Sequence, residues 1–247
     1  MEIDAVTLAL AVCIFAAAML YSSVGHAGAS AYIALMALFG IDAAVMRPTA
    51  LALNVIVASL ASFRFLKAGL FRWRVLWPFL VTALPMAYLG GTIHLSGEVY
   101  RPLVGLVLWI SAARLLWPRP LRVQSESSDP PLHFALPAGA AIGLLAGLTG
   151  TGGGIFLSPL LLMLAWAPTK QASGVAAVFV LANSVSGLAG QWTALGSLPP
   201  ELPLFAAAAL AGGLIGTTLG IRLPQVAILK LLGVVLLVAG AKLIGLY

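Results

Sequence analysis

Thr149-Gly150-Thr151-Gly152-Gly153-Gly154 interrupts an apolar run that extends from Pro130 to Thr169 without Asp, Glu, Lys or Arg. A second cluster of Gly and small polar residues, Ser22-Ser23-Val24-Gly25-His26-Ala27-Gly28-Ala29-Ser30, interrupts the run from Ala5 to Ile41. A glycine in a helix interior costs about 1 kcal/mol, so each cluster predicts a break in a helix. Both runs are longer than the roughly 20 residues that one membrane helix needs.

The composition places the chain in a lipid bilayer. Of its 247 residues, 62% are hydrophobic and 8% are charged, and the mean hydropathy is +1.08. Soluble domains carry about 25% charged residues, so this chain lacks the polar surface to dissolve. The net charge of +6 arises in short loops between apolar runs, which favours a membrane protein over a nucleic-acid-binding one.

Each half of the chain contains five apolar segments when a broken run is counted as a pair. We predict an all-α integral membrane protein with about eight to ten spans and with glycine-rich helix breaks near the midplane. Each broken pair is either two full crossings or one re-entrant hairpin. The sequence leaves both alternatives open.

The chain reads as an internal duplication around a polar linker. Residues 118–131, rich in Pro, Ser and charged residues, form this linker and are expected in the cytoplasm. Residues 1–117 and 132–247 are the two membrane repeats of a single membrane domain. Superposing the halves places Gly28 beside Gly153. Because each repeat has an odd number of segments, the two repeats enter the membrane from opposite sides and are inverted.

Basic residues in short loops set the predicted orientation. The densest basic cluster, which is placed in the cytoplasm, contains Arg64, Lys67, Arg72 and Arg74. Alternation of the spans then places every Lys and Arg inside except Arg47, Arg101 and Lys242. We expect the protein in the inner membrane, with both termini on the external, periplasmic side. A homo-oligomer is compatible with this arrangement.

The two breaks predict an anion site between the repeats. Inverted repeats with discontinuous helices are typical of transporters whose substrate binds near the midplane. Backbone N–H groups of a Gly-rich turn and the positive end of the following helix form a concave anion site. No Asp or Glu lies within a predicted span, which favours an anion over a cation. The predicted substrate-binding residues of the breaks are Ser22, Ser23, Gly25, His26, Gly28, Ser30, Thr149, Gly150, Thr151, Gly152, Gly153 and Gly154.

Polar residues of the third span in each half complete the predicted substrate site. Thr49 and Asn54 lie in the first repeat, and Ser173 and Asn183 lie in the second. Polar groups in an apolar helix need partners, so these side chains either bond a neighbouring helix or line the substrate cavity. Arg47 opens the third span, where it either anchors the span by snorkelling to the interface or steers anions.

His26 is the ionisable residue inside a break. An imidazole titrates near neutral pH, so His26 is a candidate for binding the anion and for carrying a coupling proton. Alternatively, a neutral His26 bonds backbone carbonyls that the break frees. One cysteine, Cys13, and three histidines far apart in sequence predict no metal site, and we expect no cofactor.

Three elements follow one another in the second half, namely 147–154 (GLTGTGGG), 158–160 (SPL) and 171–174 (QASG). Together they resemble the signature of the TauE/SafE sulfite exporter family of small membrane permeases, and residues 21–30 are similar to a subgroup version of it. The resemblance implies a secondary transporter of sulfur-containing anions such as sulfite, sulfoacetate or other organosulfonates, with export as the expected direction. The partners are then a small anionic substrate and the lipid bilayer, and no enzymatic activity is expected.

Two other functions are compatible with the residues. A non-transporting anchor or sensor subunit would also span the membrane, but it would have no need for polar breaks in both halves. An intramembrane hydrolase would use Ser22 or Ser23 as the nucleophile and His26 as the base. No Asp or Glu lies nearby in sequence to orient that histidine.

Overall fold

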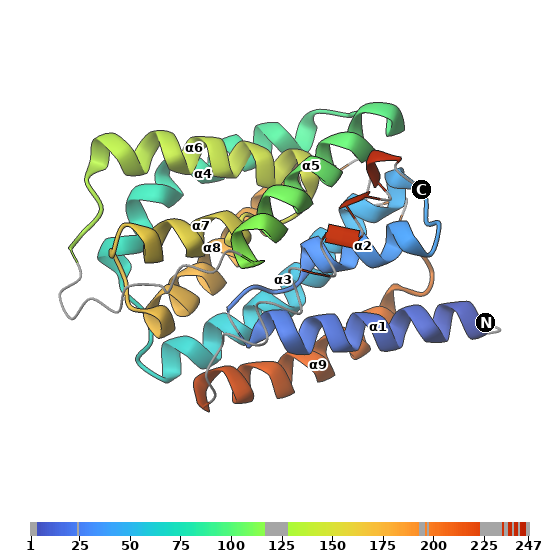
Figure 1. Ribbon diagram of the computed structural model, residues 1–247, viewed down its shortest axis with the longest axis horizontal. Coiled ribbons are helices and arrows are strands. Elements are labelled where there is room, and N and C mark those ends of the chain that lie inside the picture. The colour runs from blue at the N-terminus through green and yellow to red at the C-terminus, as the bar shows by residue number, and fades with distance from the viewer. Residues whose placement is uncertain are drawn as a thin grey trace.

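The computed structural model describes a bundle of helices (Figure 1). The described residues are 4–23, 25–116, 128–192, 196, 198–222, 234, 237–238, 240–241 and 243–245, and among them there is no strand. The first half contains α1 (Ala5–Ser22), α2 (Ala29–Leu38), α3 (Ala43–Lys67), α4 (Trp73–Thr92) and α5 (Gly97–Leu116). The second half contains α6 (Leu132–Thr149), α7 (Gly154–Met163), α8 (Thr169–Gly190) and α9 (Leu202–Arg222).

Six of the described helices are long and apolar enough to cross a membrane, namely α1, α3, α4, α6, α8 and α9. This confirms the prediction of an all-α integral membrane protein. By contrast, α2 and α7 have 10 residues each, so they are about 15 Å long. A hydrocarbon core of ~30 Å is twice that length, so neither short helix crosses it alone.

Each glycine break closes a helical hairpin (Figure 1). The hairpin of α1 and α2 opens at the end of the bundle where α3 begins, and Val6 and Phe39 line one pocket there. The hairpin of α6 and α7 opens at the other end, where α4 begins. There the ring of Trp166 lies 5.5 Å from that of Phe134 and 6.0 Å from that of Phe79. Because α2 and α7 are too short to cross alone, two full crossings do not fit either broken pair, and the re-entrant hairpin stays the prediction.

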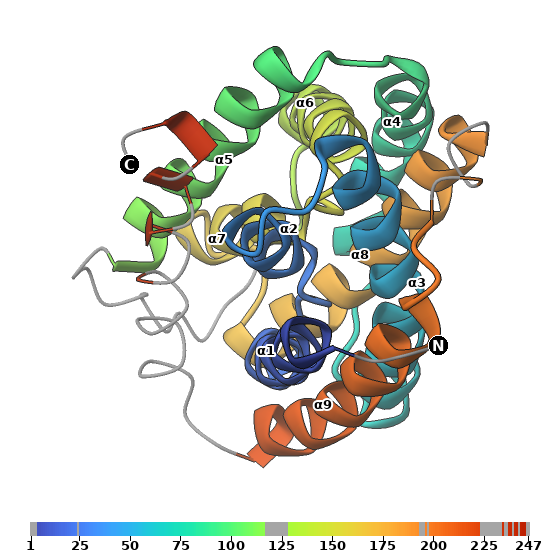
Figure 2. The ribbon, with the colours of Figure 1, turned by 90° about the vertical axis from the view of Figure 1, so that its right-hand side faces the viewer.

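The short helices occupy the centre of the bundle. Figure 1 shows α2 and α7 with their N-termini toward each other and their C-termini toward opposite ends, and Figure 2 shows the two helices next to each other inside the bundle. Beside them, α3 and α8 pack against each other. Among the candidate spans these two have the largest buried shares, 56% and 61%, so they form the scaffold around the breaks.

Glycines bring the long helices into close contact across the two halves. A Cβ at Gly139, Gly143 or Gly147 of α6 would lie 2.2 to 2.4 Å from a carbonyl oxygen of α4. A Cβ at Gly212 or Gly216 of α9 would lie 2.2 and 2.1 Å from a carbonyl oxygen of α1. Small residues at intervals of four are typical of packed membrane helices. The first helix of each half thus packs on the fourth helix of the other.

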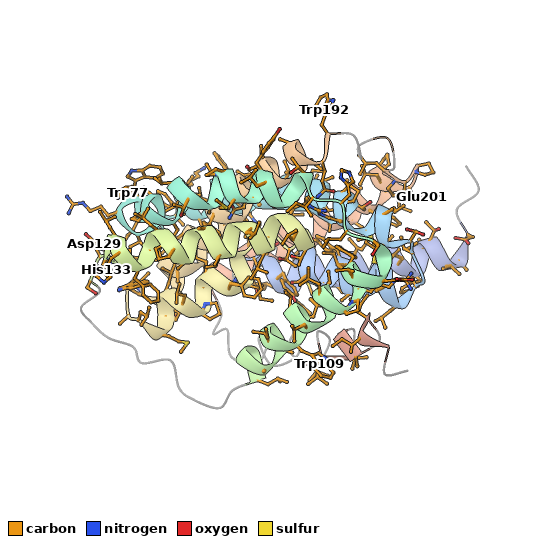
Figure 3. All side chains as sticks on the ribbon, turned by 90° about the horizontal axis from the view of Figure 1, so that it is seen from above. Trp77, Trp109, Asp129, His133, Trp192 and Glu201 are labelled. Carbon is orange, nitrogen blue, oxygen red and sulfur yellow. The ribbon has the colours of Figure 1, made fainter. Side chains whose placement is uncertain are left out.

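Charged residues gather toward the two ends of the bundle. Asp129 and His133 lie at one end and Glu201 lies toward the other (Figure 3). Asp129 forms a salt bridge of 3.0 Å with Arg72 in the loop between α3 and α4. Residues 118–127 of the predicted linker lie outside the described residues. Which side of the membrane each end faces stays a prediction.

Candidate functional site

Each break stops one helix and starts another beside it. Gly28 precedes α2 with a φ of 113°, and Gly153 precedes α7 with a φ of 80°. Both angles lie in the left-handed region that glycine adopts without steric cost. The glycine clusters therefore supply the backbone turns that a hairpin inside the membrane requires.

The two breaks contact equivalent positions of the opposite half. A Cβ at Gly25 would lie 2.1 Å from the carbonyl oxygen of Ser173, the fifth residue of α8. A Cβ at Gly150 would lie 3.0 Å from Cγ of Arg47, the fifth residue of α3. Each hairpin thus packs against the beginning of the third helix of the other half.

Asn54 of α3 connects the two breaks. Its Oδ1 accepts a hydrogen bond of 3.0 Å from the backbone N–H of Ala29, the first residue of α2. Its Nδ2 donates one of 3.2 Å to Oγ of Ser184 in α8. A Cβ at Gly152 would lie 2.5 Å from the same Nδ2. One amide therefore contacts the N-terminus of α2, the second break and α8.

The N-termini of both short helices lie near the middle of the long ones. Asn54 is the twelfth residue of α3, and Val180 is the twelfth residue of α8. Val180 takes the corresponding place in the second half, because its Cγ2 lies 2.4 Å from where Gly154, the first residue of α7, would carry a Cβ. The breaks therefore lie near mid-length of α3 and α8, and their position at the membrane midplane stays a prediction.

His26 lies against α7 of the opposite half. Its Nε2 is 2.8 Å from Oγ of Ser158, the fifth residue of α7, and both side chains are buried. Its Cδ2 lies 3.4 Å from where Gly154 would carry a Cβ. The partner of the imidazole is thus a hydroxyl of the second half of the chain rather than a backbone carbonyl of its own break.

Several hydroxyls stabilise the first break internally. Oγ of Ser23 donates to the carbonyl of Leu20 at 2.6 Å, and Oγ of Ser30 donates to the hydroxyl of Tyr21 at 3.2 Å. Bonds of this kind satisfy polar groups within the hairpin. They hold the turn in place at membrane depth, where water does not compete.

The threonines of the second break form a similar local group. The Oγ1 atoms of Thr149 and Thr151 lie 2.9 Å apart, and Thr149 also donates to the carbonyl of Leu145 at 2.6 Å. The hydroxyl of Tyr100 donates to the carbonyl of Thr149 at 2.9 Å. This bond ties the second break to α5 of the first half.

Three predicted site residues have buried polar atoms without a hydrogen-bond partner in the described part of the chain. They are Ser22 (Oγ), Thr49 (Oγ1) and Asn183 (both amide atoms). An unsatisfied buried polar group costs about 1–3 kcal/mol, so such groups are rare in native proteins. These atoms are free to bind a ligand or a water molecule.

Every predicted site residue is buried. The pocket lined by Thr7, Phe39 and Glu201 lies elsewhere, at the open end of the first hairpin. The structure therefore describes an arrangement in which the breaks pack against each other and are closed to solvent.

The sequence interpretation missed or misjudged several residues around the breaks. Ser158 and Ser184 were not predicted to contact the site, although Ser158 follows Gly154 by one helical turn and Ser184 directly follows Asn183. Of the two roles considered for Arg47, snorkelling to the interface is wrong, because the residue is 7% exposed and its guanidinium donates to backbone carbonyls.

Comparison with known proteins identifies the family. A model of the family described as Sulfite exporter TauE/SafE matches residues 10–243. The chain belongs to the TauE/SafE family. A curated relative, the probable membrane transporter protein y4hK of Sinorhizobium fredii (strain NBRC 101917 / NGR234), is 41% identical over 245 residues, which cover 98% of this chain and 99% of the relative. No solved structure matches this TauE/SafE chain.

Membership of the TauE/SafE family makes the chain a membrane transporter rather than an enzyme. The hydroxyl beside His26 belongs to Ser158, so the pairing of His26 with Ser22 or Ser23 that a hydrolase would need is not formed. The resemblance seen in the glycine-rich elements is confirmed over nearly the whole chain.

Proposed function

We propose that this TauE/SafE transporter exports small sulfur-containing anions, such as sulfite, sulfoacetate or other organosulfonates, across the inner membrane. The anion binds at mid-depth, between the N-termini of α2 and α7. One observation carries the proposal: two half-helix N-termini face each other beside a buried imidazole, an amide and hydroxyl groups. The described carboxylates lie at helix ends, away from this centre, in Asp4, Asp42, Glu98, Asp129 and Glu201.

The backbone provides the positive potential for the anion. The N-terminus of a helix carries roughly half an elementary charge, and its first N–H groups have no partner within the helix. In the first half, Oδ1 of Asn54 already accepts from Ala29. An anion bound there replaces this amide oxygen, whereas at α7 it approaches beside His26.

Side chains without partners provide further contacts for the anion. The hydroxyls of Ser22 and Thr49 and the amide of Asn183 are buried and unsatisfied among the described residues. Oxyanions of sulfur offer several acceptor oxygens, which match hydroxyl and amide donors. These residues are therefore proposed to bind the substrate once the hairpins separate.

The two halves act as inverted repeats in this proposal. The contact of Gly25 with Ser173 and that of Gly150 with Arg47 lie on opposite sides of the centre of the bundle. Moving one hairpin away from its contact exposes the centre to one side while the other hairpin keeps the second side closed. Such alternating access is the usual mechanism of transporters with inverted repeats.

The orientation follows the basic residues. The end that carries Arg64, Lys67 and Arg72 faces the cytoplasm in this proposal, and both termini face the periplasm. His26 is the candidate for a coupling proton, because it is the ionisable side chain at the centre of the described helices.

Flux of radiolabelled sulfite into proteoliposomes tests the proposal, with sulfoacetate and sulfate as competitors and with an imposed pH gradient. We expect saturable flux that sulfoacetate reduces and that Gly153→Val abolishes, since a Cβ at Gly153 would lie 2.9 Å from Ile142. Gly40→Val is the matched control, because Gly40 shares a positive φ of 78° but has no atom within 4 Å of its Cβ position.

Each result has a distinct meaning. Loss of flux in Gly153→Val but not in Gly40→Val, with both proteins folded, supports a site at the breaks. Equal flux in both variants contradicts that site. No saturable flux with folded wild-type protein contradicts sulfur-anion transport and favours another anion or a non-transporting membrane subunit.

A further inference from the structure

Arg47 carries a buried positive charge at the junction of three helices. Its Nε donates to the carbonyl of Gly147 at 2.9 Å, and its Nη1 donates to that of Ile93 at 2.9 Å. Its Nη2 donates to the carbonyls of Gly90, Gly91 and Gly147. These carbonyls belong to the C-terminal turns of α4 and α6, where backbone acceptors lack partners within the helix.

No carboxylate of the described residues lies within 4.0 Å of this guanidinium. A buried charge is costly unless it is paired, and helix C-termini provide only partial negative charge. Moreover, Nη1 carries two N–H groups, and the described residues provide it with one acceptor. Within the described part of the chain, the guanidinium therefore has neither a carboxylate partner nor an acceptor for the second N–H of Nη1.

Arg47 also contacts the second break directly. Gly147, which accepts two of its hydrogen bonds, precedes Gly150 by three residues. The side chain of Arg47 itself fills the space beside Gly150, with its Cγ 3.0 Å from the Cβ position. A change in the contacts of the guanidinium must therefore displace the end of α6 and the turn that follows it.

The position of Arg47 relates it to the central site. It precedes Asn54 by seven residues on α3, which corresponds to about 10 Å along the helix axis. Arg47 thus lies between the centre and the end of the bundle where α3 begins. The equivalent position in α8 is Ser173, so only one of the two hairpin contacts is charged.

We propose that Arg47 recognises the transported anion and couples its arrival to movement of the second hairpin. An oxyanion replaces the carbonyl of Gly147 on the guanidinium, because a charged acceptor bonds more strongly than a neutral one. The end of α6 is then released and the passage opens toward the beginning of α3. This inference rests on the proposed anion transport.

Arg64 provides a matched control within the same helix. Its Nη1 donates to the carbonyl of Leu214 at 2.6 Å and to the hydroxyls of Thr217 and Thr218 at 2.7 Å. Like Arg47 it connects α3 to a neighbouring helix through neutral acceptors. It lies at the opposite end of α3 and contacts neither break.

The test compares R47Q, R47K, R64Q and R64K in proteoliposomes by the half-saturating concentration and the maximal rate of sulfite flux. We expect R47Q to raise the half-saturating concentration about tenfold or more, since a hydrogen bond to a charged group is lost. R47K retains the charge but lacks the paired donors of the planar guanidinium, so it should raise the half-saturating concentration less than R47Q does. R64Q and R64K should leave it unchanged, even where they lower the melting temperature.

A second readout does not depend on flux. Sulfite should raise the melting temperature of the detergent-solubilised chain, and R47Q should abolish this shift while R64Q retains it. Sulfite should also speed maleimide labelling of Leu148→Cys in a Cys13→Ser background, because residue 148 directly follows Gly147, whose carbonyl sulfite is proposed to release. In R47Q the labelling rate should be the same with sulfite and with chloride.

A lower maximal rate in R47Q with an unchanged half-saturating concentration and an unchanged sulfite shift would overturn the inference and leave Arg47 as a structural cap. If R47Q does not fold, R47K decides by the same two readouts. If the wild-type chain shows no flux, the proposed function fails. In that case, a melting-temperature shift with sulfite that requires Arg47 would still support anion recognition. The absence of such a shift would refute anion recognition too.

Discussion

The N-termini of α2 and α7 occupy corresponding places in the two halves but have different neighbours. The backbone N–H of Ala29 donates to Oδ1 of Asn54 at 3.0 Å, whereas Gly154 faces the methyl groups of Val180. His26 of the first half lies beside the second of these ends. The shared architecture determines where the two ends lie, and individual side chains determine what each end can bind.

The largest effect is expected where the first break contacts α8. Gly25→Ala places a Cβ 2.1 Å from the carbonyl oxygen of Ser173, so backbone must move. We expect the free energy of unfolding in detergent to fall by about 3 kcal/mol, with loss of transport. Gly69→Ala is the control, since Gly69 has a φ of 70° and no atom within 4 Å of its Cβ position. The control should lose about 1 kcal/mol from backbone strain alone. Equal losses would show that the contact is unimportant.

The difference between the N-termini of α2 and α7 can be tested by exchanging the side chains that face them, Asn54 and Val180. Asn54→Val deprives Ala29 and Ser184 of a partner, which should lower the free energy of unfolding by about 2 kcal/mol. Val180→Asn should cost less, because the new amide can accept from the N-terminus of α7. Denaturant titration of both variants measures the difference. An unchanged free energy of unfolding in Asn54→Val would mean that the amide does not stabilise α2.

The contact of His26 with Ser158 separates a structural role from a coupling role. Ser158→Ala should lower the free energy of unfolding by about 1 kcal/mol through loss of the 2.8 Å bond. It should retain the pH dependence of sulfite flux, whereas His26→Gln should abolish this dependence. If His26→Gln retains the pH profile, ionisation of the substrate itself, and not of His26, accounts for the coupling to protons.

The smallest effect on stability is expected at Thr49. Its buried hydroxyl has no partner among the described residues, so Thr49→Val breaks no hydrogen bond there and should not lower the free energy of unfolding. Thr217→Val is the control, since its hydroxyl donates to the carbonyl of Gly213 at 2.8 Å and accepts from Arg64. The control should lose about 1 kcal/mol. If Thr49 contacts the anion, Thr49→Val alone should raise the half-saturating concentration. An unchanged value would remove Thr49 from the proposed site.

The breaks were predictable because their signal is local. A cluster such as Gly152-Gly153-Gly154 disfavours a helix by itself, and the surrounding apolar run places it in the membrane. The hydroxyl partner of His26 was not predictable, because Ser158 is 132 residues away in sequence. Arg47 was misjudged for a related reason. Its position at the start of a span suggested contact with water, while the carbonyl groups that surround it come from α4 and α6.

The sequence by itself determined that the chain is a helical membrane protein with two glycine-rich breaks, because hydropathy and glycine content act on each segment separately. The tertiary structure decided that each break closes a helical hairpin, that α2 is capped by Asn54 while α7 faces Val180, and that Arg47 lies buried beside the second break. These features depend on contacts between segments distant in sequence, which no local pattern encodes.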